Sequence, residues 1–243
     1  MAREKTVFAL GFFDGVHLGH AALLEKAKER ARELGADPAV LTFDLHPDTL
    51  VFGKPVPLIN SAGGRADIIR RLFGIEKVLC IHFNRETMQM PWQTFLDMLA
   101  GELRAVHLVV GHDFSFGYRG EGNAARMQEY CPGLGVGVDV VPAVTLDGKV
   151  ISSTHIRNLL LQGDMDEARR FLGHPHCLLD RVHSGYKLGR TIGAPTINMR
   201  FPEGVLIPRR GVYAAHVHLP DGTYMAVTNV GVRPTVSGEE RVT

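Results

Sequence analysis

The segment GFFDGVHLGH, at residues 11–20, combines residue types that suit phosphate binding. Glycine lets backbone N–H groups approach phosphate oxygens closely. Three glycines recur in the segment at four-residue intervals: Gly11, Gly15 and Gly19. His17 and His20 stand three residues apart, so on a helix they share one face and can both donate hydrogen bonds to phosphate. A glycine-rich turn with two incidental histidines is the alternative, and position in the fold decides between them.

A second segment, ISSTHIR at residues 151–157, places hydroxyl groups beside a basic residue. Ser152, Ser153 and Thr154 can cap a helix and expose their hydroxyls. Arg157 stands one turn further on, where its guanidinium can reach a phosphate through two N–H groups. On its own this segment is better explained as a capped helix with a surface arginine. Together with the first segment it predicts a phosphate-binding site.

Alternating strand-like and helix-like stretches must position these two segments. Residues 1 to about 173 alternate apolar runs with amphipathic stretches, which predicts an α/β fold with a doubly wound, mostly parallel sheet. The expected strands are 6–11, 38–44, 77–83, 105–111 and 136–144, and the expected helices are 20–35, 66–74, 91–103, 123–131, 154–163 and 164–173. The first segment then follows the first strand and opens the first helix, where such sheets bind ligands.

After His176 the pattern changes to strand-like runs separated by glycine, proline and Asp-Gly. The runs are 177–185, 194–201, 211–219 and 223–231. They predict a second, antiparallel β-domain, a small barrel, with domains at 1–174 and 177–243. Thr196 and Asn198 are two apart on an extended stretch, so they point to the same side and offer oxygen ligands for Mg²⁺.

Composition excludes several function classes. With 45% hydrophobic and 22% charged residues, the chain is of the ordinary globular type. A net charge of +1 leaves no basic footprint for nucleic acid. No apolar run is long enough to cross a membrane or serve as a signal segment. The three cysteines form no CxxC pair, so we expect neither zinc nor disulfides, and a cytoplasmic location. Whether the chain forms a homo-oligomer stays open.

Further stretches carry a resemblance to a known family. The HxGH and ISSTxxR patterns are similar to signatures of the nucleotidyltransferase superfamily. TFDLHP at 42–47 follows the second expected strand, and GHDFSFGYRGEGN at 111–123 follows the fourth. With SGYKLGRTIGAPTIN at 184–198, PRRGVYAAHV at 208–217 and TNVGVRPT at 228–235, the chain resembles prokaryotic bifunctional riboflavin kinase/FMN adenylyltransferases, or FAD synthetases, over essentially its whole length.

The resemblance implies an adenylyl transfer from ATP to FMN in the first domain and a phosphorylation of riboflavin in the second, both with Mg²⁺. It also implies residue roles. The catalytic set is His17, His20 and Arg157. The nucleotide-binding set is Gly11, Phe13, Asp14, Gly15, Gly19, Asp113, Ser153 and Thr154. The flavin-binding set is Phe43, His46, Pro47 and Phe114. The kinase set for ATP and Mg²⁺ is Gly185, Gly189, Arg190, Gly193, Thr196 and Asn198, with Thr196 and Asn198 as metal ligands.

Three positions depart from the family pattern: Leu45 stands where proline is common, Ile197 where alanine is common, and His112–Asp113 replace a commoner pair. The family's kinase base is a glutamate in the strand after the NxGxRPT segment. Glu239 and Glu240 precede that strand, and the sequence given ends at Thr243. We therefore expect efficient FAD formation and weak riboflavin phosphorylation. Alternatives are another HxGH nucleotidyltransferase, such as a cytidylyltransferase, a flavin- or nucleotide-binding regulator, and a purely structural C-terminal part.

Overall fold

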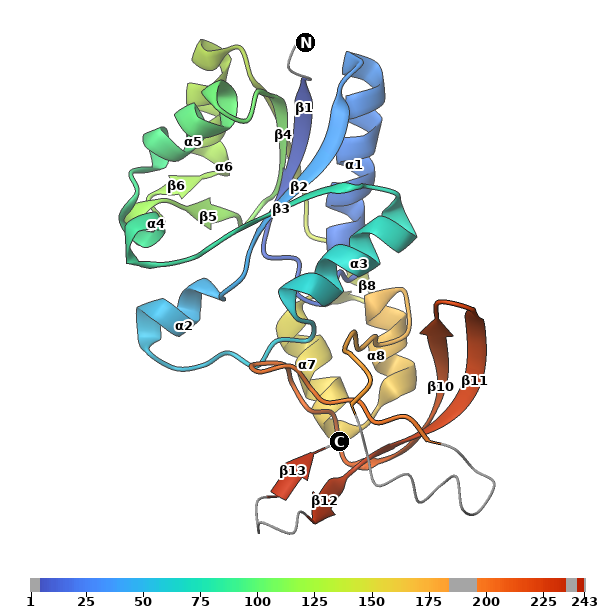
Figure 1. Cartoon of the computed structure of the whole chain (residues 1–243). Helices are drawn as coiled ribbons and strands as arrows, with labels where there is room; N and C mark the ends of the chain where they lie inside the picture. The colour runs from blue at the N-terminus through green and yellow to red at the C-terminus, as the bar shows by residue number, and fades with distance from the viewer. Residues whose placement is uncertain (1–4, 184–195, 235–239, 243) are drawn as a thin grey trace.

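The centre of the molecule is a five-stranded parallel sheet, shown in Figure 1, a computed structural model that describes residues 5–183, 196–234 and 240–242. The strand order is β3-β2-β1-β4-β7. The strands are β1 (Thr6–Leu10), β2 (Asp37–Phe43), β3 (Lys77–Ile81), β4 (Ala105–Gly111) and β7 (Gly137–Val141). The order reverses beside β1, so the loops after β1 and β4 border the crevice where doubly wound sheets bind ligands. The predicted α/β fold class is confirmed.

Helices cover both faces of the sheet because alternate strand residues point to opposite faces. Under α1 (Leu18–Leu34) and α3 (Ala62–Phe73), Val7 and Ala9 of β1 pack into one apolar cluster. Under α5 (Trp92–Gly101) and α6 (Ala124–Tyr130), Phe8 and Leu10 pack into a second. Short elements complete this second side: α4 (Arg85–Gln89), β5 (Ser115–Phe116), β6 (Gly122–Asn123) and the 3₁₀ turns Tyr118–Gly120 and Cys131–Leu134.

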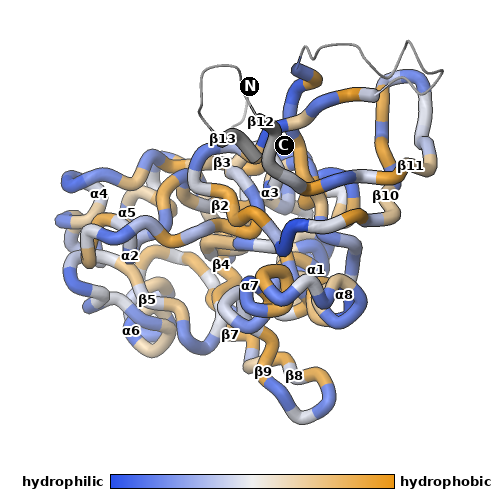
Figure 2. Tube along the Cα trace, turned by 90° about the horizontal axis from the view of Figure 1, so that it is seen from below, coloured by the Kyte–Doolittle hydropathy of each residue, from blue (hydrophilic) through white to orange (hydrophobic). Residues whose placement is uncertain are grey.

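Two further helices lie below the carboxyl-terminal edge of the sheet in Figure 1. They are α7 (Ser153–Gln162) and α8 (Met165–Leu172). A third apolar cluster holds them together, and it includes Ile59 from the loop before α3 and Leu206 from the C-terminal part. The hairpin of β8 (Thr145–Leu146) and β9 (Lys149–Val150), which leads into α7, projects from the body of the molecule (Figure 2). The carboxyl-terminal edge of the sheet is therefore covered by α7 and α8.

The C-terminal part contains antiparallel pairs. β10 (Gly211–Leu219) pairs with β11 (Gly222–Val230), and β12 (Val232–Pro234) pairs with β13 (Glu240–Val242). The expected strands at 177–185 and 194–201 differ, since their described portions meet only at a bridge between His183 and Asn198. At least one backbone group of the first stretch bonds outside the expected sheet, since the Cys177 carbonyl accepts a hydrogen bond from the Asn60 side chain. Antiparallel β-structure after residue 176 is confirmed, and closure into a barrel stays a prediction.

Helix ends agree with the expected glycine stops more closely than helix starts do. Gly35, Gly74, Gly163 and Gly173 all cap helices in the left-handed conformation. The first helix begins two residues earlier than expected, at Leu18. Two short helices, α2 (Pro47–Phe52) and α4, were not expected, because five or six residues cannot show a repeated apolar face. No helix in the described ranges is both long and apolar enough to span a membrane.

A comparison of two glycine variants tests the packing of the loop before the 3₁₀ turn Tyr118–Gly120 against α5. Gly117 has φ +74°, and a Cβ there would lie 2.8 Å from the Trp92 Cα, in backbone that cannot move aside. Gly74 also has a positive φ, +65°, but a Cβ there would meet open space. Both alanine variants lose about 1 kcal/mol for the backbone conformation, and we expect Gly117→Ala to lose about 2 kcal/mol more for the overlap.

Urea unfolding followed by the fluorescence of Trp92, the one tryptophan in the sequence, measures both losses. Equal losses in Gly117→Ala and Gly74→Ala would show that the close approach to Trp92 is not a constraint on the fold.

Candidate active site

The loop from β1 to α1 is held in an unusual backbone conformation. Phe13 and Val16 have φ values of +57° and +45°, a region that bulky side chains rarely adopt, and both side chains are fully buried. Gly15 has φ +83°, and a Cβ there would lie 2.8 Å from the Ile59 Cδ1. Strain of this kind persists only where surrounding contacts enforce it, and it is commonest at functional sites.

His17 and His20 lie together at the start of α1. His17 is the N-cap, and its Nδ1 accepts a hydrogen bond from the backbone N–H of His20 at 3.3 Å. Their rings are stacked, with centroids 3.6 Å apart and planes 11° from parallel. The buried ring of Phe13 lies 5.1 Å from that of His20, so Phe13 packs against this imidazole. Because Nδ1 of His17 is an acceptor, a neutral His17 carries its proton on Nε2.

Both imidazoles are neutral at physiological pH. Burial, followed by the nearby positive charge of Arg157, lowers the pKa of His17 to about 4. Burial also holds the pKa of His20 well below its ordinary value, with smaller effects from His17 and Arg65. Two neutral rings are hydrogen-bond donors that add no charge of their own. At a phosphate they can therefore orient the group through hydrogen bonds but cannot offset its charge. The positive charge of the site must come from arginine.

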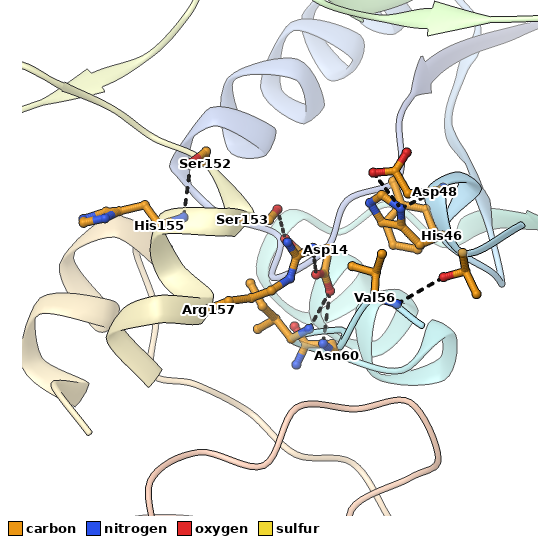
Figure 3. A network of polar contacts seen from close by, with 12 residues as sticks. Asp14, His46, Asp48, Val56, Asn60, Ser152, Ser153, His155 and Arg157 are labelled. Atoms are coloured by element: carbon orange, nitrogen blue, oxygen red, sulfur yellow. Dashed lines mark hydrogen bonds and ion pairs between the residues drawn. The ribbon is translucent and has the colours of Figure 1, made fainter. Parts of the chain in front are cut away.

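Asp14 joins the two predicted segments. Its side chain is 2% exposed, and Oδ1 accepts from the backbone N–H groups of Ile59 at 2.8 Å and Asn60 at 3.2 Å. Its Oδ2 accepts from Arg157 Nη2 at 2.8 Å, while its backbone carbonyl accepts from the Ser153 hydroxyl at 2.9 Å. Figure 3 shows Asp14 facing Arg157 across the gap between the β1–α1 loop and α7. The predicted proximity of the HxGH and ISSTxxR segments is observed.

The start of α7 supplies the remaining groups of the second segment. Ser152 is the N-cap and accepts from the backbone N–H of His155. Thr154, in the first turn, is exposed. The Arg157 side chain is 14% exposed, and its Nε is buried without a hydrogen-bond partner among the described residues. We expected Arg157 to be free for a two-pronged phosphate contact, but one of its terminal nitrogens is already bonded to Asp14.

The predicted flavin residues lie at the ends of β2 and β4. Phe43 meets Phe83 edge to face at 5.4 Å, and His46 is the N-cap of α2, of which Pro47 is the first residue. Burial lowers the pKa of His46. Phe114 is partly buried and stacks on the buried Phe116 at 5.4 Å, so Phe116 is the core member of this alternating pair.

Phe12 is a site residue that sequence reasoning missed. It is half-buried, its ring lies 4.8 Å from that of His46, and its carbonyl accepts from the Thr42 hydroxyl at 2.8 Å. It thereby connects the β1–α1 loop to the end of β2. The sequence offered one signal, an aromatic residue inside the motif at a position that the glycine and histidine pattern leaves unspecified.

Two other predicted groups are less enclosed. Asp113, after β4, is 83% exposed in its side chain, yet its negative charge raises the pKa of His17 slightly against the larger effect of burial. Gly185, Gly189, Arg190 and Gly193 lie outside the described residues. Thr196 is exposed, and Asn198 is half-buried with its carbonyl accepting from His183 N–H at 2.8 Å.

The link after α8 contacts the site in a way that the sequence did not predict. His174 is buried, with Nε2 3.1 Å from the Gly15 carbonyl oxygen. His176 Nε2 lies 3.3 Å from the Ile59 carbonyl oxygen. The same two residues, Gly15 and Ile59, meet at the strained loop. The chain that leads into the C-terminal part therefore packs directly against the loop that carries His17.

Comparisons with known proteins agree with this geometry. The FAD synthetase family model matches residues 1–155, and the riboflavin kinase family model matches residues 172–243. The chain is 36% identical over 236 residues to the bifunctional riboflavin kinase/FMN adenylyltransferase of Listeria monocytogenes, covering 96% of this chain and 74% of that protein. This chain belongs to the bifunctional riboflavin kinase/FMN adenylyltransferase family. It is therefore a family enzyme of FAD biosynthesis, and the family uses ATP, FMN and riboflavin as substrates.

Other relatives of the bifunctional riboflavin kinase/FMN adenylyltransferase family show similar coverage. The Bacillus subtilis member is 37% identical, covering 96% of this chain and 74% of that protein. The Escherichia coli K12 member is 36% identical, covering 97% and 76%. A crystal structure described as a macrolide-efflux protein from Streptococcus pneumoniae superposes with a TM-score of 0.81 at 30% identity, covering all of this chain and 79% of that one. The predicted family is confirmed.

A double-mutant cycle tests the Asp14–Arg157 ion pair. Asp14→Asn and Arg157→Met each leave a buried group without its partner, and each should lower the unfolding free energy by about 3 kcal/mol. The double variant should lose at least about 1 kcal/mol less than the two single losses together. The exposed pair Arg170–Asp147 is the control, with a coupling below about 1 kcal/mol. Additive losses at Asp14 and Arg157 would contradict the pair.

Acid sensitivity tests the burial of His17. An unfolded chain binds a proton at a histidine near pH 6.5, whereas folded His17 binds one only near pH 4, so acidification between these values favours unfolding. His17→Asn keeps an N-cap residue and removes the titrating ring. Urea midpoints at pH 6.5 and pH 4.5 should therefore differ more for the wild type than for this variant. An equal acid loss in both proteins would contradict the lowered pKa, and His218→Asn, an exposed position, is the control.

Proposed function

We propose that the site at the carboxyl edge of the sheet transfers the adenylyl group of ATP to FMN, giving FAD and pyrophosphate. The observation that carries this proposal is Asp14, which bonds to both Ser153 and Arg157 and so brings the HxGH and ISSTxxR segments to one place. Pure binding of a nucleotide does not require both segments. Membership of the family supports the same reaction.

The chemistry needs no general base. The second pKa of a phosphate monoester is about 6, so the FMN phosphate is largely a dianion at pH 7. One of its oxygens attacks the α-phosphorus of ATP, the new P–O bond forms in line, and the bond to the β-phosphate oxygen breaks with pyrophosphate as the leaving group. Neutral His17 and His20 suit this reaction, because the protein must orient phosphates rather than remove a proton.

The groups around the reacting phosphates have distinct tasks in this proposal. His17 donates from Nε2, and His20 lies stacked against it. Arg157 supplies positive charge from the side opposite α1, held in place by Asp14. Ser153, Thr154 and the backbone N–H groups of Gly11, Gly15 and Gly19 hold phosphate oxygens, with help from the positive end of α1. Donors fixed before the reaction stabilise charge without reorganising during it.

The donor set fits a magnesium ion that arrives with ATP. In the described part of the chain, no three histidine, cysteine, aspartate or glutamate side chains form a group that could hold a metal. Mg²⁺ commonly keeps substrate phosphates and waters as most of its ligands, and there it neutralises phosphate charge. Thr196 and Asn198 remain the proposed metal ligands of the kinase part, and no step above depends on them.

We divide the two family activities between residues 1–174 and 177–243. On the flavin side we assign Phe43 at the end of β2, His46 and Pro47 at the start of α2, and Phe114 after β4. We assign Asp113 to the nucleotide or the ribityl chain of the flavin. A cytoplasmic location suits a family whose substrates are intracellular metabolites. Weak phosphorylation of riboflavin stays a prediction.

Substitution of His17 tests the proposed reaction. His17→Asn retains a capping side chain but not the imidazole donor, and FAD formation from FMN and ATP should fall about 100-fold or more. Pyrophosphate release and FAD fluorescence measure the rate. His218→Asn in the β10–β11 hairpin should keep the wild-type rate. A His17→Asn variant as fast as the wild type would remove His17 from the mechanism.

The same assay separates the alternatives. A wild-type chain that binds FMN without releasing pyrophosphate would be a regulator, and one that prefers CTP would be another nucleotidyltransferase. Riboflavin in place of FMN tests the expected weak kinase activity, and rapid accumulation of FMN would overturn that expectation.

A further inference from the structure

Arg65, near the start of α3, is the largest fully buried side chain of the described residues. Its guanidinium carbon lies 4.1 Å from the centre of the Phe12 ring, and its Nη2 donates to the Phe43 carbonyl at 2.5 Å. The Phe12 ring in turn contacts His46. Arg65 therefore packs against the aromatic residue that joins the β1–α1 loop to the start of α2.

The positive charge of Arg65 has little compensation. No carboxylate in the described ranges forms an ion pair with it, and its Nε and Nη1 are buried without hydrogen-bond partners there. Asp14 and Asp44 are close enough to raise the Arg65 pKa against the larger effect of burial, but neither forms an ion pair with Arg65. The Asp14 oxygens are bonded to Arg157 and to two backbone N–H groups. Arg65 also lies near the positive end of α3, where a cation is disfavoured.

A buried cation in this arrangement destabilises the protein alone. Arginine stays charged in proteins, so the missing negative charge must come from elsewhere. The field of Arg65 reaches the site, since it contributes to lowering the pKa of His20 and that of His46, in both cases after the larger effect of burial. Both substrates of the proposed reaction carry phosphate groups, and a nearby cation attracts their negative charge.

We propose that Arg65 is a positioning residue of the adenylyl-transfer site, whose buried charge attracts the phosphates of FMN and ATP from behind Phe12 without touching them. This inference rests on the proposed function. It predicts a trade of stability for affinity: the guanidinium costs stability in the free protein and strengthens binding of the anionic substrates. If Arg65 only filled space, its replacement would not raise stability while it lowers the affinity for the substrates.

Three variants of the full chain separate charge from packing. Arg65→Met fills similar space without charge, Arg65→Lys keeps the charge, and Arg71→Met removes an exposed arginine of the same helix as a control. We expect Arg65→Met to lose about tenfold or more in kcat/KM for FAD formation. Its urea midpoint should be retained or raised. Arg65→Lys should stay within about threefold of the wild type, and Arg71→Met should be unchanged.

A spectroscopic readout tests the effect of the Arg65 charge on the site in variants whose urea unfolding shows that they are folded. In ¹⁵N-labelled protein, the pKa of His20 should move up toward its ordinary value in Arg65→Met and stay low in Arg65→Lys. Unchanged FAD formation in Arg65→Met would overturn the inference, and so would equal losses in Arg65→Met and a well-folded Arg65→Lys. An unchanged His20 pKa in Arg65→Met would do the same. A wild-type chain that makes no FAD would instead overturn the proposed function.

Discussion

The buried carboxylate of Asp14 is the constraint on which the site depends. It bonds to the loop before α3 through two backbone N–H groups and to α7 through Arg157. Three segments that are distant in sequence thus converge on one carboxylate at the carboxyl edge of the sheet. The strained backbone at Phe13 and Val16 is stable only because these contacts enforce it. Without Asp14, the loop that carries His17 would lose its ion pair to Arg157.

Electrostatics at the site follow from this arrangement. Asp14 pairs with the partly buried Arg157, and the histidines are neutral because burial disfavours their charged forms. Arg65, in contrast, is fully buried and forms no ion pair with a described carboxylate. An active site that binds anions and transfers a phosphoryl-linked group benefits from charge that is already in place. The same charge is a burden to the unliganded fold, which is the usual relation between function and stability.

Sequence reasoning predicted the sheet and the helix stops well, because glycine and apolar periodicity act locally. It also predicted that the HxGH and ISSTxxR segments form one site, although the second segment follows the β8–β9 hairpin and not a strand of the parallel sheet. It missed Phe12, Arg65 and His174, whose importance arises only from contacts across the fold. The expected helix begins at residue 66, one residue after Arg65, and only the structure shows that Arg65 belongs to α3 and that its side chain is buried. In the described part of the strand expected at 194–201, only Asn198 pairs, in a single bridge to His183. Strand pairing depends on tertiary contacts, which local sequence patterns do not specify.

The most direct test of the account is the fate of the α-phosphorus of ATP. The full chain, incubated with FMN, Mg²⁺ and ATP labelled at the α-phosphorus, should place the label in FAD in equal amount to the unlabelled pyrophosphate released. Label recovered in AMP, or retained in ATP while FMN stays unchanged, would contradict the claim that this site joins FMN to the adenylyl group.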